Sequence, residues 1–294
     1  MIIKAYAKLN LFLEITGKRK DGYHNILSLF ALTDLADIIE VKKTKKLGIS
    51  LETKNFANLE SLPKEKNLAY KAASAFCETF CVKPSHNIKI KKYIPAGAGL
   101  GGGSSDCAAV LKALCFLEKI DIKEKSARKK LFSLALKLGA DVPFFLSGEK
   151  AAVCSLKGEK IRPLKIASPM PKILIIWPDA FVSTPAVYKS FKMGSQEDIN
   201  KKKKLLKEFE KKLSFKKAFD FSPYLFNRLE NGAFKISKNV EKTAGILKSD
   251  TKGNALMTGS GGAVFAISYD IEELKRLKNR FSSLHKFIFL AKFI

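Results

Sequence analysis

Residues 95–106 read PAGAGLGGGSSD and place five glycines within seven consecutive positions. Glycine lacks a Cβ atom, so the backbone can adopt positive φ and another group can approach the main chain closely. Residues 87–93 alternate polar and apolar side chains, which predicts a half-buried strand, and residues 107–115 have the spacing of an amphipathic helix. Ser104 or Ser105 is the expected N-cap. Because a helix N-terminus favours an anion, we interpret the glycine-rich stretch as a phosphate cradle.

Other interpretations of this stretch are less favoured. A flexible linker or a serine-capped turn would rarely lie so tightly between a strand and a helix. A Walker A loop is excluded, because no Gly-Lys-Ser/Thr follows the glycines. Gly97, Gly99 and Gly102 form a G-x-G-x-x-G pattern, and Asp121 lies at about the distance that a dinucleotide site requires. However, the preceding strand alternates, unlike a buried parallel strand, and Pro95 interrupts the pattern.

Length and composition indicate an ordinary globular protein. The 294 residues suffice for one large or two moderate domains, and 46% of them are hydrophobic against 28% charged. No apolar run approaches the roughly 18 residues of a membrane span, and the N-terminus lacks the pattern of a signal peptide. We therefore expect a cytoplasmic protein without a membrane partner. The five cysteines lack metal-site spacing, which favours buried, reduced thiols.

The net charge of +26 raises the question of a nucleic-acid partner. The lysines are scattered along the chain, and lysine is less suited than arginine to reading bases. Even the lysine-dense helix expected at residues 201–217 has the pattern of a solvated helix face. A positive potential would also raise the association rate of polyanionic small molecules. We favour such small molecules as partners and expect no nucleic-acid partner.

Three polar residues each have a structural and a functional interpretation. Lys8 shares one face of an alternating N-terminal strand with Asn10 and Phe12, and could be a solvated edge lysine. His24 follows an Asp-Gly turn signal and could be a structural histidine. Asp141 directly precedes an apolar run and could be a turn or capping residue. The residues alone leave these alternatives open.

Four separated segments occur in the order found in the GHMP small-molecule kinases. They are 5–13 (AYAKLNLFL), 95–106, 139–145 (GADVPFF) and 257–265 (MTGSGGAVF). The form GLGGGSSD and the sequence DGYH at residues 21–24 resemble, more narrowly, the kinases that act on 4-diphosphocytidyl-2-C-methyl-D-erythritol. The resemblance extends from about residue 5 to residue 265.

The resemblance implies an α+β fold of two domains with the active site in the interdomain cleft. We place the ATP-binding N-terminal GHMP domain at residues 1–155 and the C-terminal GHMP domain at residues 156–294, because glycine and proline become frequent between them. The implied reaction is ATP-dependent phosphorylation of the substrate's 2-hydroxyl, in the non-mevalonate route to isoprenoid precursors. Mg²⁺ is expected to neutralise the phosphate oxygens. Its ligands stay open, with Ser105 as one candidate.

The resemblance also implies the roles of individual residues. Asp141 would be the general base, and Lys8 would keep its carboxylate ionised and stabilise the transferring phosphoryl group. Tyr23 and His24 would recognise cytosine, since one ring can stack and the other can form hydrogen bonds. Asn10 and Thr184 would also bind the substrate, Thr184 at its methylerythritol end. The residues expected to bind ATP are Pro95, Gly97, Gly99, Leu100, Gly101, Gly102, Gly103, Ser104 and Ser105.

Two other functions remain as alternatives. A GHMP kinase that acts on homoserine or mevalonate would not need the sequence at residues 21–24, because those substrates have no base. A basic nucleic-acid-binding module would not need Asp141. The chain also departs from the resembled family at Tyr6, where a proline is usual, and at Arg228, where an acid is usual.

Overall fold

The computed structural model describes residues 1–56, 63–178 and 182–294, and it contains many helices and strands. The chain forms two compact units. Unit 1 comprises Met1–Ala7, Leu35–Ala96 and Gly101–Glu149, and unit 2 comprises Lys8–Asp34, Gly97–Leu100 and Lys150–Ile294. Two long strands, β1 (Ile2–Lys18) and β2 (His24–Lys43), contribute to both units. The boundary expected between residues 155 and 156 stays a prediction.

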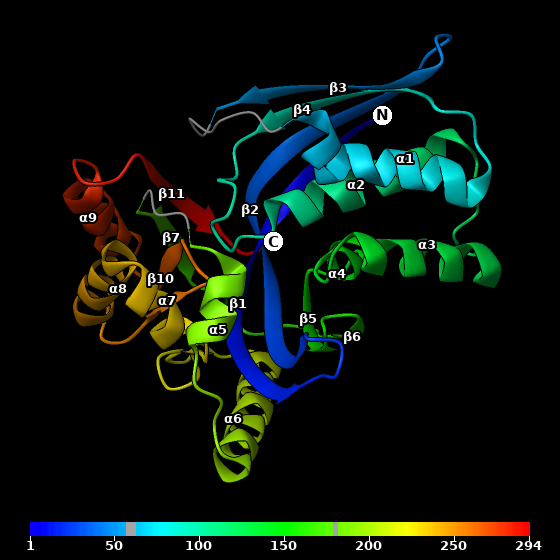
Figure 1. The fold of residues 1–294 in the computed structure, drawn as a ribbon. Helices are drawn as coiled ribbons and strands as arrows, with labels where there is room; N and C mark the ends of the chain where they lie inside the picture. Colours follow the sequence, from blue (N-terminus) through cyan, green and yellow to red (C-terminus); the bar gives the residue numbers. More distant parts are fainter. Residues whose placement is uncertain (57–62, 179–181) are drawn as a thin grey trace. The chain divides into compact units, whose positions relative to one another are not determined.

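Unit 1 consists of a sheet with helices beside it (Figure 1). Its other elements are β3 (Gly48–Asn55), η1 (Lys64–Lys66), α1 (Leu68–Phe80), β4 (Ser85–Lys92), α2 (Gly102–Leu117), α3 (Lys125–Leu138) and α4 (Val142–Ser147). Strand β4 pairs with β3 in parallel and with residues 38–43 of β2 in antiparallel orientation. The expected strand at residues 87–93 is therefore confirmed. The N-cap of helix α1 is Asn67, whose side chain accepts a hydrogen bond from the Ala69 N–H.

Small side chains allow the helices of unit 1 to pack closely. Helix α2 buries residues on all sides, among them Ala108, Ala109 and Ala113, and contacts both α1 and α4. Helix α1 contributes Phe76, which is fully buried. Helix α3 buries one apolar stripe, with Leu131 among its residues. This packing fixes the start of α2, where the glycine-rich stretch ends.

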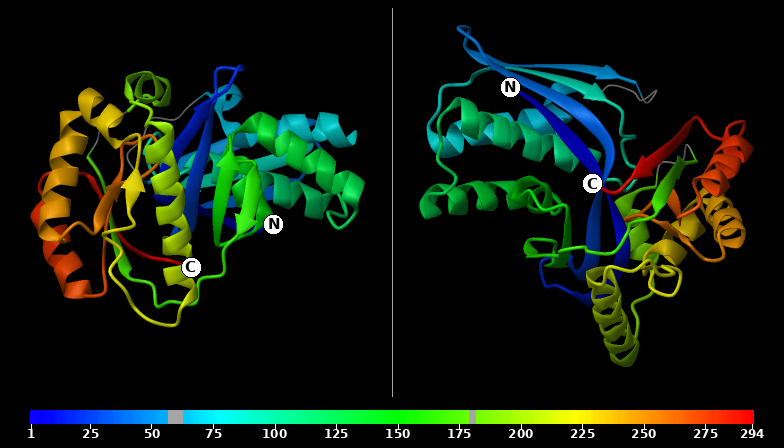
Figure 2. Two further views of the ribbon diagram at one scale, coloured as in Figure 1. Left: turned by 90° about the horizontal axis from the view of Figure 1, so that it is seen from below. Right: turned by 180° about the vertical axis from the view of Figure 1, so that it is seen from behind.

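Unit 2 contains a four-stranded sheet in the order β11-β7-β10-β9, which helices α8 and α9 contact (Figure 2). Its elements are β5 (Ala151–Leu156), β6 (Lys160–Pro163), β7 (Lys172–Trp177), α5 (Thr184–Ser190), α6 (Gln196–Ser214), β8 (Phe226–Asn227), α7 (Glu230–Ile236), α8 (Lys238–Asp250), β9 (Ala255–Met257), β10 (Val264–Ser268), α9 (Ile271–Phe281) and β11 (Phe287–Lys292). The central strand β7 is buried, as its apolar run predicts. Strands β9 and β10 pair in antiparallel orientation and flank residues 258–263, which we call the second glycine loop.

The remaining strands of unit 2 form a sheet with β1 and β2. Phe12 and Leu13 of β1 pair in parallel with β8, and residues 26–31 of β2 pair with β5. Helix α6 buries Ile199, Leu206, Phe209 and Leu213. Its lysines are exposed, as expected, except Lys202, which is half-buried.

The structure also shows the state of the cysteines and the length of the helices. The five cysteines are free thiols, and all are buried except Cys81, which is exposed at the end of α1. Across the described ranges, none of the helices combines the length and the apolar composition needed to cross a membrane.

Candidate active site

Lys8 lies in the interior of unit 2, so its interpretation as a solvated edge lysine is wrong. The residue exposes only 3% of its surface. Its Nζ atom donates hydrogen bonds to Asn10 Oδ1 at 2.5 Å and to the Gly99 carbonyl at 2.9 Å. A buried ammonium group is costly without such acceptors. The strand therefore holds a positive charge at the unit 2 part of the glycine-rich stretch.

Asn10 connects this lysine to the second glycine loop. The Asn10 N–H donates to Thr258 Oγ1 at 3.0 Å, and the Thr258 hydroxyl donates to Asn10 Oδ1 at 3.2 Å. The Asn10 amide nitrogen donates to Ser28 Oγ at 2.9 Å. With its amide oxygen and nitrogen both engaged, Asn10 orients Lys8; its contact with substrate stays a prediction.

The second glycine loop is held by Asn227, whose role the sequence did not reveal. The Asn227 amide nitrogen donates to the carbonyl groups of Met257 and Gly259, each at 2.8 Å. Within the loop, Ser260 Oγ lies 2.6 Å from Thr184 Oγ1. Thr184 is the exposed first residue of α5. It therefore lies beside the loop, and its substrate contact stays a prediction. The preceding Phe181 lies outside the described residues.

A cluster of rings surrounds His24. The imidazole centroid lies 5.1 Å from the Tyr188 ring and 5.4 Å from the Phe191 ring. Neither aromatic residue was predicted as a site residue, although Tyr188 ends the segment that contains Thr184 and Phe191 comes shortly after it. Burial, and secondarily the charge of Lys18, lowers the pKa of His24 below its ordinary value. The cluster thus favours a neutral imidazole between aromatic rings, which suits a flat heterocycle.

The lowered pKa of His24 predicts a pH-dependent stability difference. The unfolded chain binds a proton at His24 more readily than the folded chain, so protonation favours unfolding. The free energy of unfolding is therefore unaffected by His24 above its ordinary pKa of 6.5, and it decreases as the pH falls from there through the lower pKa of the folded protein. We expect the stability advantage of the wild type over His24→Asn, measured by urea unfolding, to shrink from pH 7.5 to 5.5. A constant difference would contradict this prediction.

Tyr23 differs from His24, because 59% of its surface is exposed. Lys157 Nζ lies 4.1 Å from the centroid of the Tyr23 ring. Asp21 bonds to Lys157 and Arg19, which, with the Tyr23 N–H, lower the pKa of its carboxyl group to about 2. The turn therefore presents the Tyr23 ring at the surface of unit 2, and its contact with cytosine stays a prediction.

The glycine-rich stretch contributes residues to both units. Gly97, Gly99 and Leu100 belong to unit 2, whereas Pro95 and residues 101–105 belong to unit 1. The expected serine N-cap is wrong, because α2 already begins at Gly102 and its N-cap is Gly101, with a φ of +74° and no side-chain cap. Glycine adopts this left-handed conformation more readily than serine. Ser104 and Ser105 therefore lie inside the first turn.

The first turn of α2 offers a suitable surface for phosphate. The N–H groups at a helix start have no partner within the helix and attract an anion. Gly103 is exposed, Ser104 is half-buried, and Ser105 is buried. Among the ATP-binding candidates, Gly97 is also exposed, Gly99 and Gly101 are half-buried, and Pro95, Leu100 and Gly102 are buried.

A buried ion cluster holds this helix start in unit 1, and the sequence did not reveal it. Lys92 Nζ donates to Asp106 Oδ2 at 2.7 Å and also contacts Asp37. Asp37 Oδ1 accepts the N–H groups of Tyr93 and Ile94, where the chain leaves β4. Burial raises the pKa of Asp106 to about 8, although Lys92 opposes the shift. Asp106 thus ties the start of α2 to Lys92 at the end of β4.

Asp141 lies in unit 1 at the N-cap position of α4, immediately before Val142 and Pro143. Its side chain makes no capping hydrogen bond, and the residue is half-buried. The capping interpretation therefore does not account for its carboxylate. Lys8 belongs to unit 2, so the pairing of Asp141 with Lys8 stays a prediction from the resemblance.

Comparison with known proteins gives a consistent result over the whole chain. Residues 67–149 match the family model of the GHMP kinases N terminal domain. A curated relative from Clostridium botulinum (strain Eklund 17B / Type B), a 4-diphosphocytidyl-2-C-methyl-D-erythritol kinase, is 37% identical, and the alignment covers 100% of both proteins. A solved structure of 4-(cytidine 5'-diphospho)-2C-methyl-D-erythritol kinase matches with a TM-score of 0.74 and 32% identity, covering 100% of this chain and 99% of that one. The Methanococcus jannaschii mevalonate kinase matches with a TM-score of 0.71 and 18% identity over 100% and 98% of the two chains, a likeness of fold alone.

Proposed function

The chain belongs to the 4-diphosphocytidyl-2-C-methyl-D-erythritol kinase family of the GHMP kinases, and we propose that it phosphorylates the 2-hydroxyl of that cytidine compound. The predicted α+β GHMP kinase fold and the prediction of a small-molecule kinase are confirmed. Among the structural observations, the ring cluster of His24, Tyr188 and Phe191 carries the proposal. Homoserine and mevalonate lack a base that such rings could recognise.

We propose the following roles in phosphoryl transfer. Asp141 accepts the proton of the substrate hydroxyl as that oxygen attacks the γ-phosphorus of ATP. Lys8 stabilises the negative charge on the transferring group, and its hydrogen bonds to Asn10 and Gly99 hold its ammonium group in place. Most of the acceleration then comes from positioning and electrostatics, because this transfer needs little covalent chemistry from the protein.

ATP is the phosphoryl donor of GHMP kinases, and we propose that Mg²⁺ accompanies it. Within the described residues, no group of three or more His, Cys, Asp or Glu side chains could hold a metal ion. This fits a magnesium ion held mainly by phosphate oxygens and water. Ser104 is half-buried and Ser105 is buried at the start of α2, and Ser105 stays the candidate protein ligand. Bound Mg²⁺ would neutralise charge on the β- and γ-phosphates.

We further propose that the enzyme works in the cytoplasm, with a small cytidine diphosphate compound as its partner and neither nucleic acid nor membrane. The high net charge of +26 supports rapid capture of ATP and of a diphosphate substrate. Salt should therefore slow substrate association.

The test is ADP release with ATP, Mg²⁺ and 4-diphosphocytidyl-2-C-methyl-D-erythritol, with homoserine and mevalonate assayed in parallel. Turnover with the cytidine compound alone supports the proposal. Turnover with homoserine or mevalonate instead would reject the substrate assignment, and no turnover with any of the three would reject the proposed reaction.

His24→Ala should raise the KM for the cytidine substrate about 10-fold or more and leave the KM for ATP nearly unchanged. The reason is that the imidazole lies among the rings proposed to bind the base, and losing one polar contact with a base costs about 1–3 kcal/mol. Steady-state kinetics with each substrate varied in turn gives both values. A suitable control is His285→Ala, since that ring stacks on Phe281 elsewhere in unit 2. Equal changes in both KM values would remove His24 from the base pocket.

A further inference from the structure

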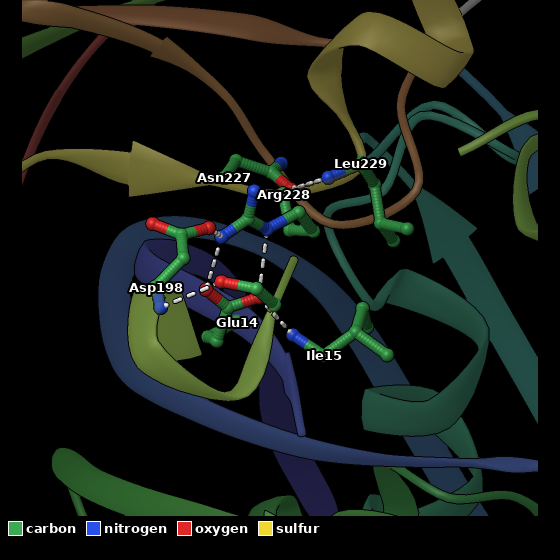
Figure 3. A network of polar contacts seen from close by, with 7 residues as sticks. Glu14, Ile15, Asp198, Asn227, Arg228 and Leu229 are labelled. Carbon is green, nitrogen blue, oxygen red and sulfur yellow. Dashed lines mark hydrogen bonds and ion pairs between the residues drawn. The ribbon is translucent and has the colours of Figure 1, made fainter. Parts of the chain in front are cut away.

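Arg228 lies at the centre of a polar network that the catalytic residues do not use (Figure 3). Its guanidinium group donates two hydrogen bonds to Glu14, from Nε to Oε1 at 2.8 Å and from Nη2 to Oε2 at 2.6 Å. Glu14 is completely buried in β1, and Oε1 also accepts the Ile15 N–H at 2.7 Å. Such a two-pronged contact fixes both the position and the plane of the guanidinium group. Because a buried carboxylate needs such donors, the pair anchors Arg228 on β1.

The same guanidinium group reaches the start of α6. Nη2 also contacts the carboxylate of Asp198, which lies in the first turn of that helix. The chain fits closely around this contact, because a Cβ atom on Gly194 would lie 2.4 Å from the Asp198 carboxylate and 2.9 Å from Nη2. Arg228 thus holds residues 194–198 against β1.

Arg228 is close in the chain to residues that contact two parts of the proposed substrate site, the second glycine loop and the ring cluster. On the backbone side, the Arg228 N–H donates to the Leu13 carbonyl at 2.8 Å, and the neighbouring Asn227 holds the second glycine loop. On the side-chain side, only two residues lie between Gly194 and Phe191, which belongs to the ring cluster. Helix α7 also packs closely on Phe191, since a Cβ atom on Gly232 of that helix would lie 3.1 Å from the Phe191 backbone nitrogen.

We propose that Arg228 is a positioning residue for base recognition, which it serves by holding the Phe191 segment on β1 through Glu14 and Asp198. This inference rests on the proposed function, because it concerns the cytidine end of that substrate. The guanidinium group is essential to the arrangement. A lysine ammonium is a point charge and cannot satisfy both oxygens of Glu14 in one plane while reaching Asp198.

Asp198→Asn is the sharpest test, because it weakens only the contact between Arg228 and Asp198. The Glu14 pair stays intact, and the Asp198 side chain is 38% exposed, so the fold should persist. We expect the KM for the cytidine substrate to rise about 5-fold, with the KM for ATP, kcat and the melting temperature nearly unchanged. Glu210→Gln is the matched control, because Glu210 pairs with Arg162 near the other end of α6 at 2.7 Å. The control should leave both KM values unchanged.

Arg228→Lys provides a second variant, which should raise the KM for the cytidine substrate at least as much as Asp198→Asn. An unchanged KM in Asp198→Asn, equal rises for both substrates, or the same rise in Glu210→Gln would overturn the inference. The wild type is assayed in the same series. Absence of wild-type turnover would reject the proposed function itself, whereas wild-type turnover with an unchanged KM in Asp198→Asn would reject only the role of Arg228.

Discussion

Asp141→Asn should lower kcat at least about 100-fold while ATP still binds. The amide is nearly the same size as the carboxylate, but it cannot accept the proton that the substrate hydroxyl must lose. Because Asp141 makes no capping hydrogen bond to α4, the substitution should leave the helix and its buried residues intact. Single-turnover kinetics would measure the chemical step, and calorimetric titration with a non-hydrolysable ATP analogue would measure nucleotide binding.

Asp121→Asn is the matched control for this prediction. Asp121 also precedes a helix in unit 1, and its carboxylate accepts the Lys123 N–H at 2.8 Å in an exposed turn. We expect this variant to retain wild-type kcat. A near-wild-type rate in Asp141→Asn would show that Asp141 is not the base, and a comparable loss in Asp121→Asn would attribute the effect to general damage.

Local pattern was sufficient to predict the elements that carry the site. Alternation predicted the strand at residues 87–93, and helical spacing predicted the helix at residues 107–115, which lies within α2. Both depend on side chains close together in sequence, where the periods of strand and helix differ clearly. The motifs, by resemblance, supplied the family, which the comparisons then confirmed.

What could not be predicted depends on contacts between distant residues. His24 meets Tyr188 and Phe191, and nothing in the local sequence relates residues so far apart. The burial of Lys8 likewise depends on acceptors, among them the Gly99 carbonyl, that only the folded chain brings together. The N-cap of α2 was misplaced for a different reason. Serine favours caps in general, but Gly101 adopts a left-handed conformation at which a side chain is strained.

Gly99→Ala should destabilise the protein by at least about 2 kcal/mol more than a matched glycine substitution, because overpacking adds to backbone strain. Gly99 has a φ of +78°, and an added Cβ atom would lie 2.2 Å from the Thr258 carbonyl oxygen and 3.2 Å from that of Gly261. Both are backbone atoms, so no side-chain rotation can relieve the clash. The second glycine loop would have to move, and with it Thr258, which holds Asn10.

Gly148→Ala is the matched control, because it introduces the backbone strain of an alanine at positive φ without a steric clash. Gly148 has nearly the same φ, +82°, but nothing lies within 4 Å of an added Cβ atom. It should cost only about 1–2 kcal/mol, the strain of a left-handed residue. Urea unfolding of the two variants therefore measures the close approach of the two glycine loops in unit 2. Equal losses of stability would mean that the loops can separate freely. A larger loss in Gly99→Ala, accompanied by weaker ATP binding, would mean that their contact holds Lys8 beside the Gly99 carbonyl and supports the proposed ATP site.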